Sequence, residues 1–395
     1  MPTPEETIAV AGLADAEDVD ALLRASFGGS RSHWTAVILA REAAAEGAEG
    51  VRAAGAGCDE YGLVLRRKDH VVSHVGLSPM QLQLGPARLT CGLVGGVATD
   101  SEARGRGYMT RLMTEALRRM REDGWPLSSL GGDRQRYAHF GYETCGTRYH
   151  VQVTPRSLAG RGVPPASIEE VDVNGDGVLE RVCAAYRSLG YRVDRRHLNR
   201  LRWTPGGYGG ARVFLGDDGY LMCARRNPPE GESLRIMEVV SPTGREAGLI
   251  LALLELTSCS RATVEVEPGS EERMVRLLQV AGSWGSGPGR MYRIVDWVRL
   301  LQGLQPILEE RAADLPPFAL SVGCRWQESL DVATIEWDGC RMSIQEGKRC
   351  AGYVELEERF LVAQVVGGPY PRHEPLGLFG RLLPVPVHVP FPELR

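Results

Sequence analysis

Apolar residues recur every three to four positions just after Gly107, with arginines between them, and this spacing predicts an amphipathic helix. The preceding Val97–Thr99 stretch predicts the end of a strand, and a short buried strand is expected after the helix. A tyrosine-rich motif then ends at Tyr142. The apolar face of the helix consists of Met109, Leu112, Met113, Ala116, Leu117 and Met120.

The residues before this helix also predict regular elements. Strands are expected at Thr7–Val10, through Tyr61–Leu84 around a turn at residues 67–70, and at Leu89–Thr99. A helix is expected to start at Asp15, because acidic residues favour a first helical turn. Its predicted buried stripe is Val19, Leu22, Leu23 and Phe27.

The middle of the chain repeats this order. A hairpin turn is expected at residues 216–219, then a strand at Ile236–Val240, a helix at Ala247–Leu256 and a strand at residues 264–266. We interpret the order as a degenerate second copy of the first domain that lacks a binding turn. An unrelated α/β segment is the alternative.

The last part predicts a smaller α+β unit. A glycine-rich break at Gly285–Gly289 precedes a helix at Asp296–Ala312, interrupted or bent at Pro306. Strands near residues 318–322, a hairpin at residues 338–339 and a helix near residues 356–366 follow. The expected fold class is α/β, with tandem mixed sheets followed by an α+β domain. The expected domains are residues 1–150, 151–288 and 289–395.

Composition narrows the functional classes. A chain of 395 residues is expected to form two or three domains. The formal net charge of −4 argues against a nucleic-acid or anionic-membrane partner. The first ten residues lack the features of a signal peptide, and the nine cysteines show no C-x-x-C spacing, so we expect a cytoplasmic protein with reduced thiols. No histidine stands at metal-ligand spacing, so no metal is expected.

The turn between the predicted strand and helix carries the clearest chemistry. Its sequence is Arg104-Gly105-Arg106-Gly107-Tyr108-Met109. Glycines let backbone N–H groups approach a ligand closely, and a helix start adds a positive dipole end. Two arginines add formal charge. This combination predicts a cradle for a pyrophosphate group.

Two motifs together resemble a known family. The turn gives Arg104-x-x-Gly107-x-Met109, which is similar to the acyl-CoA-binding signature of the GNAT superfamily of N-acetyltransferases, although the usual last glycine or alanine is replaced by methionine. Tyr137-Ala138-His139-Phe140-Gly141-Tyr142 resembles the Tyr-x-x-Phe-Gly-Tyr motif of the enhanced-intracellular-survival (Eis-like) branch. The resemblance implies tandem GNAT-type sheets followed by a sterol-carrier-type domain, and a homo-oligomer.

The resemblance also implies a reaction and its residues. The reaction would be acetyl transfer from acetyl-CoA to a primary amine of an aminoglycoside, polyamine or lysine. Val97, Ala98 and Thr99 would polarise the thioester carbonyl, and the turn with Arg104, Gly105, Arg106, Gly107, Tyr108 and Met109 would bind the pyrophosphate. Tyr137 would be the general acid, the C-terminal carboxylate of Arg395 the general base, and Phe27 and Trp34 substrate contacts.

Several alternatives stay open from the sequence. Glu393 or a water is an alternative base, because the chain ends in arginine where relatives end in an aromatic residue. His139 is expected to be structural. The alternative function is a non-catalytic protein that binds CoA or a lipid through its C-terminal domain.

Overall fold

The computed structural model describes residues 6–28, 33–45, 60–172, 175–195, 212–226, 233–266, 269, 271–368 and 379–387. In these ranges, one sheet has 13 strands and a second has four. The expected α/β class is confirmed. Among the described residues, no helix combines the length and the apolar character needed to cross a membrane.

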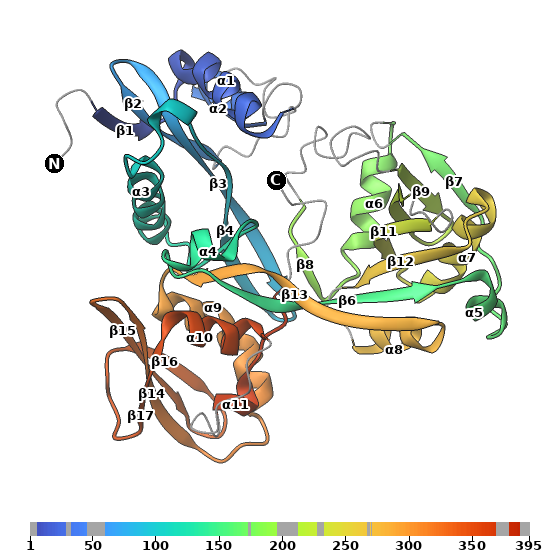
Figure 1. Cartoon of the computed structure of the whole chain (residues 1–395). Coiled ribbons are helices and arrows are strands. Elements are labelled where there is room, and N and C mark those ends of the chain that lie inside the picture. The colour runs from blue at the N-terminus through green and yellow to red at the C-terminus, as the bar shows by residue number, and fades with distance from the viewer. Residues whose placement is uncertain are drawn as a thin grey trace.

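The first half forms a mixed sheet between two helical layers (Figure 1). Four antiparallel neighbours come first, and a helix then crosses to a parallel strand. Alternate residues of a strand face opposite sides, so Leu63 and Leu65 pack with the crossover helix while Val64 packs with the first two helices. The elements are β1 (Glu6–Val10), α1 (Ala16–Phe27), α2 (His33–Ala45), β2 (Tyr61–Arg67), β3 (His70–Leu84), β4 (Ala87–Thr99), α3 (Tyr108–Glu122) and β5 (Leu127–Leu130).

The second half repeats this order, as predicted. Four antiparallel neighbours precede the helix α7, which crosses to a parallel strand. The same sequence of pairings therefore occurs twice in one chain. The elements are β7 (Ile168–Val171), α6 (Val178–Tyr186), β9 (Arg212–Gly216), β10 (Tyr220–Arg226), β11 (Ser233–Val240), α7 (Glu246–Thr257), β12 (Arg261–Val266) and α8 (Glu271–Gln279), with α5 (Pro155–Ala159) before β7 and β8 (Tyr191–Val193) paired to β3.

Each half gives its last strand to the other half. The strand β6 (Glu143–Val153) follows the first half but pairs with β12, whereas β13 (Ser283–Ile294) follows the second half but pairs with β5. The two long strands also pair with each other and cross the molecule side by side (Figure 1). The exchange joins both halves into one continuous sheet.

The break predicted at Gly285–Gly289 is wrong, because these residues lie inside β13. In the part of the chain that the structure describes, only β6 pairs with these residues of β13, since β5 reaches no further than Met291. Pro288 therefore occupies a place where β13 has one neighbouring strand, the position in a sheet that tolerates proline. The domain boundary expected between residues 288 and 289 also falls within this strand.

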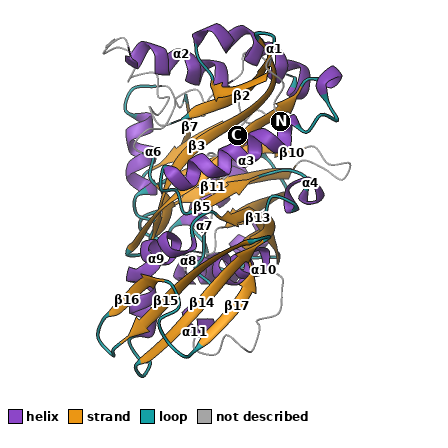
Figure 2. Ribbon diagram, turned by 90° about the vertical axis from the view of Figure 1, so that its left-hand side faces the viewer, coloured by secondary structure: helices purple, strands orange, loops and turns teal. Residues whose placement is uncertain are grey.

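The last part packs a four-stranded sheet, in the order β16-β15-β14-β17, against helices (Figure 2). The apolar side chains in its interior form one cluster with residues of β3 and β4 in the large sheet. The predicted helix through Pro306 is present and continues past the proline. The elements are α9 (Trp297–Ala312), β14 (Phe318–Trp326), β15 (Ser329–Trp337), β16 (Met342–Glu346), β17 (Tyr353–Glu357), α10 (Glu358–Val366) and α11 (Phe379–Leu382).

Candidate functional site

The strands β4 and β5 separate halfway along their length. They pair only through residues 91–94 of β4 and 127–130 of β5, after which the chain turns away at Gly131 toward α4 (Arg134–Ala138). The end of β4, residues 95–99, therefore keeps β3 on one side and has no strand on the other side among the described residues. Its backbone groups at that edge are available to a ligand.

The same end of β4 contains a β-bulge. Its register against β3 shifts between His74 and Gly76, so Gly96 and Val97 both face Val75. Gly96 has a φ of 57°, which a residue with a side chain rarely adopts. A bulge redirects backbone groups locally and is common beside active sites.

Two buried aromatic side chains fix this bulge from behind. The Nδ1 atom of His74 donates to the carbonyl oxygen of Gly96 at 2.7 Å. The indole of Trp34 covers Gly96 so closely that a Cβ atom there would lie 2.5 Å from its Nε1 atom. Burial lowers the pKa of His74 to about 4, so the imidazole is neutral at pH 7.

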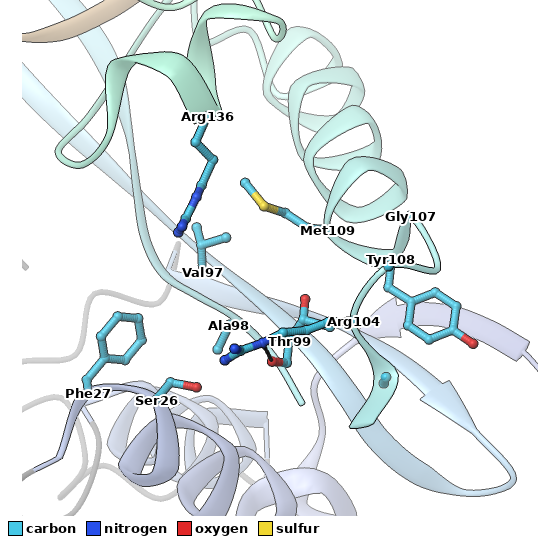
Figure 3. A pocket seen from close by; sticks show the side chains of 12 residues that line it. Ser26, Phe27, Val97, Ala98, Thr99, Arg104, Gly107, Tyr108, Met109 and Arg136 are labelled. Carbon is cyan, nitrogen blue, oxygen red and sulfur yellow. Dashed lines mark hydrogen bonds between the residues drawn. The ribbon is translucent and has the colours of Figure 1, made fainter. Parts of the chain in front are cut away.

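A pocket of about 390 Å³ opens in front of the bulge (Figure 3). It lies between the end of β4, the turn before α3, the end of α1 and α4. Phe27 and Ser26 border one side, and Met109 and Arg136 approach each other on the opposite side. The pocket brings together nine residues predicted for the site: Phe27, Val97, Ala98, Thr99, Arg104, Gly105, Gly107, Tyr108 and Met109.

The turn before α3 has the geometry expected of an anion cradle. Gly105 and Gly107 have φ values of 77° and 74°, and no atom lies within 4 Å of a Cβ placed on either. Gly107 is the N-cap of α3, so the first N–H groups of the helix lack helical partners and point toward the turn. The side chain of Arg104 borders the pocket and donates to the carbonyl oxygen of Thr99 at 3.4 Å.

Two members of the predicted turn point elsewhere. Arg106 is exposed and is not among the lining residues of the pocket. The ring of Tyr108 is buried on the other side of the turn, and its hydroxyl donates to Glu6 at 2.7 Å (Figure 3). Tyr108 therefore anchors the start of α3 to β1, and it can offer the ligand only its backbone.

Tyr137 lies on α4 but is not among the lining residues of the pocket. Its side chain is 6% exposed, packs 6.3 Å from the ring of Tyr142, and occupies the space beside Gly132. Burial raises the pKa of Tyr137, and the guanidinium of Arg136 opposes this rise. A phenol with a raised pKa stays protonated at neutral pH.

Arg136 is a site residue that the sequence reasoning missed. It is exposed, lines the pocket, and points into it above Val97 (Figure 3). The signal available in the sequence was its position directly before the motif tyrosine. A short helix turns successive side chains in different directions, so Arg136 reaches the pocket while Tyr137 is packed in the protein interior.

The two predicted substrate contacts differ in position. Phe27 was expected in a buried stripe, but it is 65% exposed at the rim of the pocket, where α1 ends. Trp34 is 4% exposed and lies behind the bulge, outside the lining of the pocket. Arg395 and Glu393 lie outside the described residues.

The corresponding turn in the second half is filled by the protein itself. The hydroxyls of Ser241 and Thr243 donate to the carboxylate of Asp218, so a side-chain anion occupies the turn before α7. The side chain of Arg276 lies over Gly244, 3.0 Å from where a Cβ would stand. The second copy therefore keeps the scaffold and lacks an open cradle, as predicted.

Comparison with known proteins identifies the family of the domain that holds the pocket. Residues 9–145 match the family model of the acetyltransferase (GNAT) domain. No curated protein matches the sequence. The N-terminal part is therefore a GNAT acetyltransferase domain.

Solved structures share the fold over nearly the whole chain. A GCN5-related N-acetyltransferase from Anabaena variabilis is 15% identical, with 97% of each chain covered and a TM-score of 0.65. A probable N-acyltransferase from Enterococcus faecalis is 16% identical, with 95% of this chain and 93% of that chain covered and a TM-score of 0.62. Eis1 from Mycobacterium abscessus is 14% identical, with 89% and 87% covered and a TM-score of 0.60. At these identities the likeness establishes the fold alone.

Proposed function

Because its N-terminal part is a GNAT acetyltransferase domain, we propose that this protein transfers an acetyl group from acetyl-CoA directly to a primary amine. One observation carries the proposal. A single pocket joins the open edge of β4, the glycine turn before α3, and the helix that bears Tyr137 and Arg136. Acetyl transfer from acetyl-CoA uses three features: a hydrogen-bond donor to the thioester carbonyl, an anion site for the pyrophosphate of CoA, and an acid that protonates the departing sulfur.

The residues fit acetyl-CoA as the co-substrate. Its pyrophosphate is a double anion, and the start of α3 offers unpaired N–H groups, two glycines without steric obstruction and the charge of Arg104. Its thioester supplies an activated acetyl group. The bulge residues Gly96 and Val97 lie where the sheet opens, so their backbone can polarise the carbonyl of that group.

Tyr137 is proposed as the general acid. Its ring belongs to the apolar cluster beneath the pocket, its pKa is raised by burial, and it adjoins Arg136, which lines the pocket. In this proposal its Oη atom gives a proton to the departing thiolate. The carboxylate of Arg395 stays a prediction for the base that takes the amine proton.

The acceptor is proposed to be a primary amine on an aminoglycoside-like molecule, a polyamine or a lysine side chain. The exposed ring of Phe27 stands at the rim of the pocket, where it can stack on an apolar or cationic acceptor. The formal net charge of −4 also suits a cationic acceptor.

Calorimetric titration of acetyl-CoA into the purified protein tests binding, with Arg104→Glu as the variant. Arg156→Glu is the matched control, because Arg156 is exposed on α5, remote from the pocket lining, and the charge changes equally. We expect Arg104→Glu to weaken binding and Arg156→Glu to leave it unchanged. Equal affinities in all three proteins would contradict the cradle.

Turnover is tested separately by following free thiol when acetyl-CoA and a panel of primary amines are added. An amine-dependent release of thiol supports the transferase. Binding of acetyl-CoA without thiol release from any amine in the panel would favour the non-catalytic, CoA-binding alternative.

A further inference from the structure

The motif turn Tyr137–Tyr142 is attached to the C-terminal part of the protein through one arginine. Arg293, near the end of β13, donates from Nη1 to the carbonyl oxygen of Phe140. Its Nε atom lies 3.0 Å from Oε1 of Glu358, the first residue of α10. Its guanidinium also lies 5.3 Å from the ring centre of Trp326, on β14. One side chain therefore joins the turn to the helix α10 and to the strand β14.

This contact is buried and tightly fitted. The side chains of Arg293 and Glu358 are 13% and 4% exposed. Gly141 has a φ of 85°, and a Cβ there would lie 2.8 Å from Oε1 of Glu358 and 3.1 Å from Nε of Arg293. Burial raises the pKa of Glu358 to about 8, against the effect of Arg293, so the contact does not depend on a fully charged carboxylate. The glycine of the Phe-Gly-Tyr motif is thus required partly because these two side chains lie directly against its backbone.

Backbone hydrogen bonds within the turn connect Phe140 and Tyr142 to Tyr137. The carbonyl oxygen of Tyr137 accepts from the N–H of Phe140 at 3.0 Å and from the N–H of Tyr142 at 3.4 Å. A shift of the Phe140 carbonyl therefore moves the backbone of Tyr137. Neither Arg293 nor Glu358 lines the pocket in front of the bulge, so neither can act on a ligand there directly.

We propose that Arg293 and Glu358 are positioning residues that hold Tyr137 at the acetyl-transfer site, and that the C-terminal part is thereby a working component of that site. This rests on the proposed function, because it assumes that Tyr137 acts on the thioester. It gives the third part of the chain a role that does not depend on binding a ligand of its own. The sequence alone could not predict this role, because residues 140, 293 and 358 are far apart along the chain.

The test compares Arg293→Met and Glu358→Ala with Asp331→Ala. Asp331 is the matched control, since its ion pair with Arg121, at 2.8 Å, also joins the two parts, and no hydrogen bond connects it to the motif turn among the described residues. Hydrogen exchange of the backbone amides of residues 137–142, measured by mass spectrometry, reports the turn directly and needs no activity. Acetyl-CoA affinity and kcat are measured on the same proteins.

We expect faster exchange in residues 137–142 for Arg293→Met and Glu358→Ala, and no change there for Asp331→Ala. With an amine substrate, kcat should fall roughly tenfold to hundredfold, the cost of a displacement of order 1 Å, while the Kd for acetyl-CoA stays unchanged. Should Arg293→Met fail to fold, Arg293→Lys keeps the charge opposite Glu358 but is too short to hold the Phe140 carbonyl as well.

Unchanged exchange in both test variants would overturn the proposal, as would an equal change in the Asp331→Ala control. These outcomes do not depend on catalysis. If exchange increases as expected but the wild-type protein releases no thiol with any amine, the restraint on the turn stands and the proposed function fails instead.

Discussion

The imidazole of His74 donates a hydrogen bond from Nδ1 to the carbonyl oxygen of Gly96, 2.7 Å away, and thereby fixes the bulge of β4 from the side opposite the pocket. The Nε2 atom of the same ring is buried and has no hydrogen-bond partner among the described residues. An unpartnered buried nitrogen costs stability, and protonating it would bury a charge as well. The neutral tautomer with the proton on Nδ1 is therefore the form that the fold requires.

This relationship predicts a pH-dependent stability. The pKa of His74 is lowered from 6.5 to about 4 by burial. A lowered pKa means that the unfolded chain binds the proton more readily, so the contribution is complete above the unfolded pKa and is lost as pH falls toward the folded pKa. Wild-type protein should lose up to about 3 kcal/mol through His74 across this window. Urea unfolding from about pH 7 to about pH 4 should show a smaller loss in His74→Asn.

Two glycines of the site should respond differently to alanine. Gly96→Ala forces a Cβ to within 2.5 Å of the buried Trp34 ring at a φ of 57°, so we expect a loss of about 2–4 kcal/mol in unfolding free energy. Gly105→Ala meets no atom within 4 Å at a φ of 77°, so strain alone should cost about 1 kcal/mol. Gly105→Ala should instead weaken acetyl-CoA binding. Equal stability losses for the two variants would contradict the packing of Trp34 on the bulge.

Tyr137→Phe tests the acid. The ring and its packing against Tyr142 are kept, so acetyl-CoA should bind as in the wild type. Turnover should fall about 10²–10⁴-fold, the usual contribution of a positioned general acid. Single-turnover and steady-state rates with the same amine measure the effect. A variant that turns over at nearly the wild-type rate would remove Tyr137 from the mechanism.

Arg136→Gln should change both the rate and its pH profile. The guanidinium of Arg136 lowers the pKa of Tyr137 against the effect of burial, so its removal should raise that pKa and move the alkaline limb of the kcat profile upward. We expect kcat to fall by about tenfold, equivalent to about 1.4 kcal/mol. Arg134→Gln is the control, because Arg134 lies on the same helix but pairs with Glu143. An unshifted alkaline limb in Arg136→Gln would show that the two side chains act independently.

Much of the site could be predicted from local patterns. The glycine turn, the amphipathic α3 and the strand end at Val97–Thr99 are contiguous, and nine predicted residues do border one pocket. The misplaced residues failed for local reasons. Phe27 fits the helical period and borders the pocket as predicted, but it stands where α1 ends and is 65% exposed, not part of the buried stripe. Arg106 and Tyr108 share the turn with Arg104, but Arg106 is not among the lining residues of the pocket, and the ring of Tyr108 points away from it (Figure 3).

The sequence by itself determined most of the elements and their repeated order, because hydrophobic periodicity and glycine turns act over a few neighbouring residues. Only the tertiary structure decided that β6 and β13 are exchanged between the halves, and that Arg293 links the motif turn to α10. Strand pairing and side-chain hydrogen bonds join residues more than a hundred positions apart, as between Ala262 and Val153 or between Arg293 and the backbone of Phe140. Such partners are chosen by packing of the whole chain, and no local pattern records them.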